Sequence, residues 1–185
     1  VLRDRQLLNL DFGIFALHAA QMALFTALPF AMTQLGLEKI QHWKVYLPST
    51  ITGLVIMIPL IIIGETRNKL KQVFILGIAC IAAAQIGLLF GMHSIWLITA
   101  YLIVYFIGFN VLEASLPSMV SKIAPSDLKG TAMGVYNTMQ SVGLFVGGAS
   151  GGWLFQQYGF AGVFTFCSVL MLLWLVIAVL APAPK

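Results

Sequence analysis

The residues best suited to chemistry are one histidine and one glutamate that lie inside long apolar segments. His18 falls in the apolar run 12–35, and Glu113 falls in the stretch FNVLEASLPSMV, which Pro117 also interrupts. A carboxylate near the centre of a bilayer costs about 2.5 to 3.5 kcal/mol on insertion scales, so Glu113 is expected to face a cavity or a partner. Unperturbed histidine and glutamate side chains titrate near about pH 6.5 and about pH 4.3, so binding a proton is the chemistry that such a pair offers.

The two residues are predicted to lie at similar depth in a membrane. At ~1.5 Å per residue, His18 is about 9 Å from the start of its apolar segment near Phe12. Glu113 is about 13 Å from the end of its own segment near Lys122, on the same side. Two interpretations remain open: a static hydrogen-bonded pair that fixes two helices, and a pair whose contact is coupled to proton binding.

The composition is that of an integral membrane protein. Hydrophobic residues make up 60% of the 185 residues and charged residues only 9%, against roughly 25% charged residues in soluble domains. Apolar runs of about 20 residues are long enough to cross a bilayer as helices, and backbone groups in lipid must be satisfied within each segment. The sequence therefore predicts an all-α membrane protein, a single bundle over residues 1–185, with six spans at about 12–35, 43–64, 73–91, 95–120, 131–155 and 162–181.

The basic residues predict the orientation of this bundle. With the N-terminus in the cytoplasm, eight lysines and arginines fall on the inner side and two, Lys39 and Lys44, on the outer side. The inner set consists of Arg3, Arg5, Arg67, Lys69, Lys71, Lys122, Lys129 and Lys185. An excess of this kind predicts cytoplasmic termini in a multi-pass protein of the cell inner membrane. It also explains the net charge of +4 without a nucleic-acid partner.

Short connections between the spans predict that consecutive helices pack as antiparallel neighbours. Six spans divide into three plus three with opposite orientation, which is typical of the inverted repeats of transporter halves. The third and sixth spans carry few polar side chains, so they are expected to form the outer wall.

The fifth span carries glycines at four-residue spacing, a pattern that lets another backbone approach closely. Gly143, Gly147 and Gly151 form one such series, and Asn137, Gln140 and Ser141 share one face. Packing inside the same bundle and a sliding contact with a second bundle are both compatible with the pattern. We take these six residues as candidates for an interface with a second bundle.

Further polar and aromatic residues share a face with the two titratable ones at 100° per residue. They are candidates for lining a cavity, with ordinary core packing as the alternative: Gln21, Met22, Phe25, Phe106 and Asn110. Asp11 lies at the predicted membrane boundary, where it is expected to cap the first helix.

The sequence offers no enzymatic site. No Ser/His/Asp set, phosphate-binding loop or metal-ligand spacing occurs, and Cys80 and Cys167 lie on different spans. We therefore expect no enzyme activity, no cofactor and no metal. The chain begins at Val1 without a methionine, so we interpret it as a piece of a longer protein.

Four stretches carry a family resemblance. The loop GETRNKLKQ, residues 64–72, resembles a degraded G-x-x-x-D-R-x-G-R motif in which Gly64 matches, Asn68 replaces the acid and Lys69 the arginine, beside Arg67. With these, HWKVYLPS, FNVLEASLPSMVSKIAP and KGTAMGVYNT make the whole chain similar to the C-terminal six-helix half of a major facilitator superfamily transporter. Within this superfamily, the last three stretches more specifically resemble the YajR type of drug:proton antiporter.

The resemblance implies a function and a role for each span. The six spans of this chain would correspond to spans seven to twelve of the family. His18 and Glu113 would belong to a protonatable patch, the first and fourth spans (seven and ten) would line a central cavity, and the second and fifth spans (eight and eleven) would contact the N-terminal half. The implied function is half of a proton-coupled transporter that exports small, mostly apolar compounds by alternating access. The N-terminal half, the lipid bilayer, the substrate and protons would be its partners. The alternative is a non-transporting, self-associating six-helix scaffold in which His18 and Glu113 form a structural pair.

Overall fold

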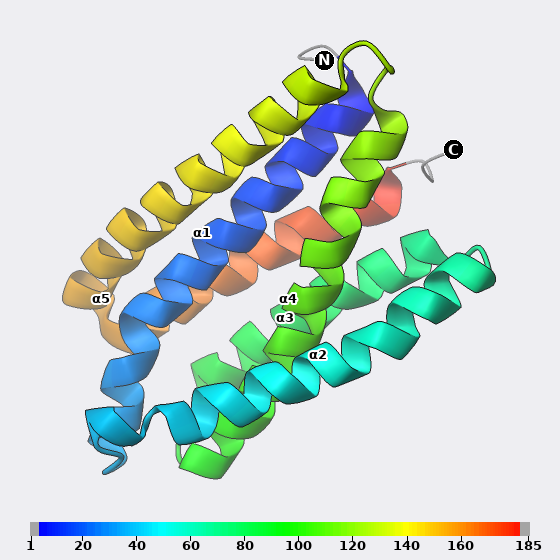
Figure 1. The fold of residues 1–185 in the computed structure, drawn as a ribbon. Helices are drawn as coiled ribbons and strands as arrows, with labels where there is room; N and C mark the ends of the chain where they lie inside the picture. Colours follow the sequence, from blue (N-terminus) through cyan, green and yellow to red (C-terminus); the bar gives the residue numbers. More distant parts are fainter. Residues whose placement is uncertain (1–3, 182–185) are drawn as a thin grey trace.

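The computed structural model describes residues 4–181, and over this range the chain is helical throughout, as the sequence predicts (Figure 1). Its five long helices are each long and apolar enough to cross a membrane. They are α1 Arg5–Gln34, α2 Trp43–Thr66, α3 Leu70–Gly91, α4 Ile95–Ile123 and α5 Lys129–Leu180, and a short 3₁₀ turn, η1 Lys39–Gln41, precedes α2. Arg3 and Lys185, which enter the orientation argument, lie outside the described residues.

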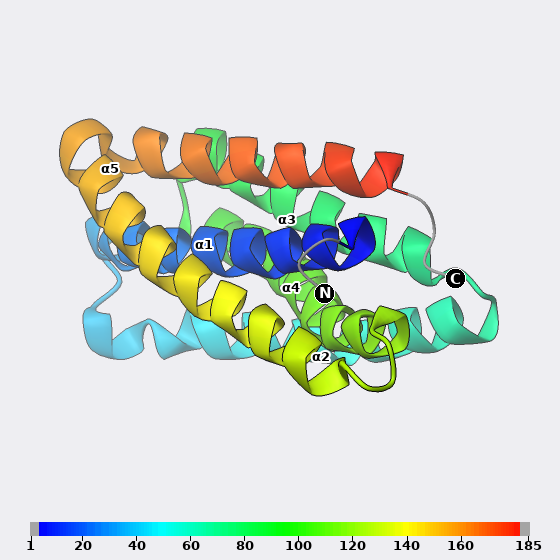
Figure 2. The same cartoon turned by 90° about the horizontal axis from the view of Figure 1, so that it is seen from above.

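Helix α5 has 52 residues, which would make about 78 Å if it were straight. It is not straight, because Gly159 has φ 61° and ψ −151°, a region that is essentially open only to glycine. Figures 1 and 2 show that the yellow part of α5 leads to this bend and that the orange-to-red part returns from it, so the two parts form a hairpin. The sequence predicts a connection between 155 and 162, so the bend lies where two spans were expected to meet. The number of membrane crossings remains a prediction.

Helix α1 begins earlier than the hydropathy predicts. The Asp4 carboxylate accepts hydrogen bonds from the backbone N–H groups of Gln6 at 2.8 Å and Leu7 at 3.3 Å, so Asp4 is the N-cap. The prediction that Asp11 caps this helix is wrong. Asp11 lies almost two turns inside α1 and is buried, because the helix starts at a cap in the polar segment before the apolar run.

Helices α1, α3, α4 and α5 enclose most of the core, whereas α2 is attached mainly to α4 and α3. Helix α2 is the least buried of the five, since only 17% of the residues in its most apolar stretch are buried inside the bundle. Its outer face exposes Leu47, Ile51, Leu54, Val55, Ile58, Ile62 and Ile63. Such a face is stable only against lipid or another apolar surface.

The basic residues gather at one end of the bundle. The start of α1, the start of α3, the end of α4 and the end of α5 meet there, since Gln6, Lys71, Ile123 and Ala181 line one pocket. Lys122 lies nearby, beside the end of α2. Lys39 and Lys44 lie at the other end, just after α1. The structure thus segregates the described basic residues as the sequence predicts, while cytoplasmic placement of the richer end remains a prediction.

Candidate functional site

His18 and Glu113 meet across α1 and α4. The His18 Nε2 atom lies 3.4 Å from Glu113 Oε1, so the similar depth inferred from the sequence corresponds to a direct contact. The imidazole is buried, whereas 35% of the Glu113 side chain is exposed in this bundle. Glu113 Oε1 itself is buried and has no hydrogen-bond partner among the described residues. The two groups are therefore close enough for an ion pair and not aligned as a hydrogen bond.

A third residue, Gln140 of α5, completes this cluster. The amide nitrogen Nε2 of Gln140 lies 2.8 Å from His18 Nε2. On the other side of the ring, His18 Nδ1 lies 3.2 Å from the backbone carbonyl of Ile14. Because a carbonyl oxygen only accepts, Nδ1 carries a proton in this arrangement, and Nε2 of a neutral ring is the acceptor for the Gln140 amide.

Aromatic side chains wall the cluster on the α4 side. Phe109 packs edge-on to the His18 ring at 5.9 Å between centroids, and Tyr105 stacks on Phe109 at 5.9 Å. The Tyr105 hydroxyl is buried and has no hydrogen-bond partner among the described residues, so neither side chain donates to the Glu113 carboxylate. An unpaired charge is costly in such surroundings, so the charge of this cluster depends on how His18, Glu113 and Gln140 share protons and hydrogen bonds.

The glycines of α5 bring Gln140 to His18. A Cβ built on Gly143, one turn beyond Gln140, would lie 2.5 Å from the Phe15 carbonyl oxygen, and one on Gly151 would lie 2.7 Å from Ala23 Cα. Gly147 meets Ala19 at even closer approach. The two backbones are therefore in contact along three turns, and this register places Gln140 opposite His18.

The prediction that Gly143, Gly147 and Gly151 form an interface with a second bundle is therefore wrong. All three are buried against α1 of the same bundle, because the small residues Ala19 and Ala23 complement them. Gln140 is half-buried and points to His18 instead of outward. Asn137 and Ser141 are exposed, so their predicted role in a contact with another half stays a prediction.

The predicted cavity-lining residues divide into two groups. Gln21, Met22, Phe25 and Asn110 are partly buried, as expected for the wall of a cavity. Phe106 is buried, and a Cβ on Gly53 of α2 would lie 2.7 Å from the Phe106 carbonyl carbon. Close packing of α2 on α4 at Gly53 accounts for this burial, and the role of Phe106 in lining a cavity stays a prediction.

The loop that resembles the family motif forms a tight turn between α2 and α3. Gly64 is buried, and a Cβ there would lie 3.1 Å from Val73 Cγ2. Asn68 has φ 55°, a left-handed conformation that asparagine tolerates better than most residues. Arg67 ends α2 and Lys69 precedes α3, both exposed. Asn68, which stands at the position of the motif's acidic residue, therefore allows the left-handed backbone conformation of the turn in this chain.

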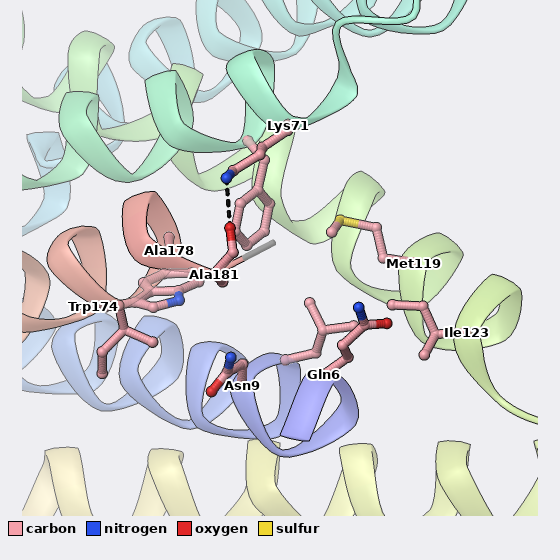
Figure 3. A pocket seen from close by; sticks show the side chains of 11 residues that line it. Gln6, Asn9, Lys71, Met119, Ile123, Trp174, Ala178 and Ala181 are labelled. Atoms are coloured by element: carbon pink, nitrogen blue, oxygen red, sulfur yellow. Dashed lines mark hydrogen bonds between the residues drawn. The ribbon is translucent and has the colours of Figure 1, made fainter. Parts of the chain in front are cut away.

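Lys71, which follows this turn, has a structural partner at the other end of the chain. Its ammonium donates to the backbone carbonyls of Ala181 at 2.5 Å and Val179 at 3.3 Å. Figure 3 shows this bond at the edge of a pocket that Trp174, Met119 and Gln6 also line. A cation at the last carbonyls of a helix is favourable, so Lys71 fixes the end of α5 to the start of α3. No simple periodicity predicts a bond between positions so far apart in the chain.

Metal binding finds no support in residues 4–181, where no group of three or more His, Cys, Asp or Glu side chains is close enough to hold an ion. Cys80 and Cys167 are both free thiols. The cluster of His18, Glu113 and Gln140 is the candidate site, and its side chains are of types that can exchange protons and form hydrogen bonds.

Comparison with known proteins identifies the family of the chain. The family model described as Major Facilitator Superfamily matches residues 10–185. The chain is 39% identical over 178 residues to "Inner membrane transport protein YajR" of Escherichia coli, which covers 96% of this chain and 39% of that protein. It is 29% identical over 188 residues to an "Uncharacterized transporter" of Buchnera aphidicola, covering 97% of this chain and 46% of the relative. The chain therefore spans less than half the length of these relatives.

Proposed function

The chain belongs to the Major Facilitator Superfamily, a family of transporters and not of enzymes, and from this premise we propose that it is the C-terminal half of a proton-coupled secondary transporter. With an N-terminal half it would export small, mostly apolar compounds by alternating access across the cell inner membrane. The inner-membrane assignment is supported by the name of the Escherichia coli relative and by the five apolar helices.

The observation that carries the proposal is the contact of His18 with Glu113 at 3.4 Å. Both side chains exchange protons, and the exposed part of Glu113 gives the cluster access to whatever lies beside this bundle. A proton that enters changes the charge of the cluster in surroundings with few alternative partners, so proton binding and helix position become linked.

The substrate class rests on the partly buried side chains near the cluster. Met22 and Phe25 of α1 are partly exposed, and Phe25 packs on Tyr46 of α2 at 5.5 Å between ring centroids. Flexible methionine and flat aromatic surfaces accommodate varied apolar shapes. Only a few polar groups, such as Gln21 and Asn110, would add hydrogen bonds.

The experiment uses the full-length transporter in vesicles. The lipophilic aromatic dye Hoechst 33342 serves as the substrate, and a trapped pH indicator reports proton movement. We expect the wild type to move dye in exchange for protons that move down their gradient. Glu113→Gln should lose the linked proton movement, because an amide cannot take up the proton. Glu38→Gln, an exposed carboxylate at the opposite end of the bundle, is the control and should behave as the wild type. Wild-type coupling in Glu113→Gln would remove Glu113 from the mechanism.

A further inference from the structure

We propose that Gln140 competes with Glu113 for the Nε2 atom of His18, so that the Gln140 amide decides when the histidine and the carboxylate can pair. This inference rests on the proposed function, since it specifies how the same cluster is regulated. It assigns to Gln140 a positioning role that the sequence pattern does not reveal.

The competition follows from the number of sites on one nitrogen. With Nδ1–H bound to the Ile14 carbonyl at 3.2 Å, Nε2 of the neutral ring has a single lone pair. The Gln140 amide lies at 2.8 Å from that atom, and Glu113 Oε1 lies at 3.4 Å. The shorter contact takes the lone pair, which agrees with the absence of a hydrogen-bond partner for Glu113 Oε1 among the described residues. The structure therefore corresponds to the arrangement in which the amide holds the imidazole.

Protonation reverses the arrangement. A proton that reaches Nε2 forms a new N–H bond; it comes from hydronium in adjoining solvent, which becomes water, or from the carboxylic acid form of Glu113, which becomes the carboxylate. The hydrogen bond from the Gln140 N–H to Nε2 then breaks, because two donors face each other. The new Nε2–H donates to Glu113 Oε1, and the Gln140 amide must rotate or move away. One proton is gained by the ring and one hydrogen bond is exchanged, with no other reactant.

The position of Gln140 is not free to drift. Gly143 lies one turn further along α5 and is in backbone contact with Phe15 of α1, three residues before His18. Because α1 and α5 touch directly here, displacement of one helix along the other changes the distance from the Gln140 amide to Nε2. Helix position and proton occupancy of His18 would therefore control each other.

A substitution of Gln140 leaves the other titratable groups around the cluster in place. On α4 these are Glu113 and Tyr105, and on α1 Asp11. On α5 these are Cys167, whose Sγ lies 3.7 Å from the Ala20 carbonyl, and Tyr136, which is within electrostatic range of Glu113 and Asp11. A change caused by Gln140→Met would therefore report the loss of the amide.

The test measures His18 directly by ¹⁵N NMR of the full-length protein labelled at histidine, with the signal assigned by its absence in His18→Gln. The wild type should show the Nδ1–H tautomer with a hydrogen-bonded Nε2 near neutral pH. In Gln140→Met, which keeps the side-chain length without a donor, protonation of His18 should occur at higher pH by about 0.5 to 1 unit, since a donor to the neutral ring is lost. Thr138→Val, on the same turn and exposed, is the matched control.

The outcomes separate this inference from the proposed function. An Nε2–H tautomer in the wild type, or an unchanged titration in Gln140→Met, overturns the role of Gln140. If Glu113→Gln keeps full proton coupling while Gln140→Met still shifts the His18 titration, the competition stands and the proton-coupling function fails. If proton coupling holds, dye transport by Gln140→Met should shift its pH dependence in the same direction as the NMR signal, and a shift in transport without a shift in the NMR signal contradicts the proposal.

Discussion

Replacing Gly143 by alanine tests whether contact between the backbones of α1 and α5 holds the cluster together. The new Cβ would lie 2.5 Å from the Phe15 carbonyl oxygen, whereas ordinary contact begins at 3.4 Å, so the helices must separate by about 0.9 Å (3.4 minus 2.5). If Gln140 moves with Gly143 by this amount, its 2.8 Å contact to His18 lengthens to about 3.7 Å. That distance is beyond a hydrogen bond.

The expected energy separates into two terms. Overpacking of this size costs about 1 to 3 kcal/mol, while alanine in place of glycine favours a helix by about 0.8 to 1 kcal/mol. Gly148→Ala is the matched control, because a Cβ there meets no atom within 4 Å in this bundle and only the second term applies. The difference in thermal unfolding midpoint between the two variants in detergent then isolates the steric term. We expect Gly143→Ala to unfold at a temperature several degrees below that of Gly148→Ala. Its His18 titration should resemble that of Gln140→Met. Equal midpoints and an unchanged titration would refute the reasoning.

Two further predictions concern the ends of helices. Lys71→Met should speed amide hydrogen exchange at residues 177–181 about fivefold, because the last carbonyls of α5 lose a donor worth about 1 kcal/mol; Lys69→Met, exposed and two residues away, should leave that exchange unchanged. Gly159→Ala should lower the unfolding free energy by about 1 to 3 kcal/mol, because its positive φ lies in a region nearly restricted to glycine. Gly152→Ala, where a Cβ has open space, serves as its control in the same thermal melt.

The elements of the fold could be predicted from hydropathy because lipid imposes a length on each apolar run. Predicted and observed helix limits differ by only a few residues in most cases, and the largest difference, at the start of α1, comes from a polar cap before the apolar run. The bend in α5 was expected as a connection, and its reduction to one residue reflects the special conformation of Gly159. Hydropathy averaged over many residues does not reveal a bend that depends on the conformation of one residue.

The candidate site was predictable only in part. The similar depth of His18 and Glu113 was enough to predict their contact, since two titratable groups at one level of a bundle have few other partners. The direction of the Gln140 side chain could not be derived, because Asn137, Gln140 and Ser141 share one broad face and only Gln140 turns to His18. Likewise, glycine spacing predicts a close approach of two helices without identifying the partner, which is α1 in this bundle.

The backbone contact of α1 with the first part of α5 has a mechanical consequence. At the turns of Gly143, Gly147 and Gly151 no side chain of α5 separates the two helices, so there are no rotamers that could rearrange to absorb a small strain. A shift between α1 and α5 that follows a change of charge at His18 would therefore be carried directly by the two backbones.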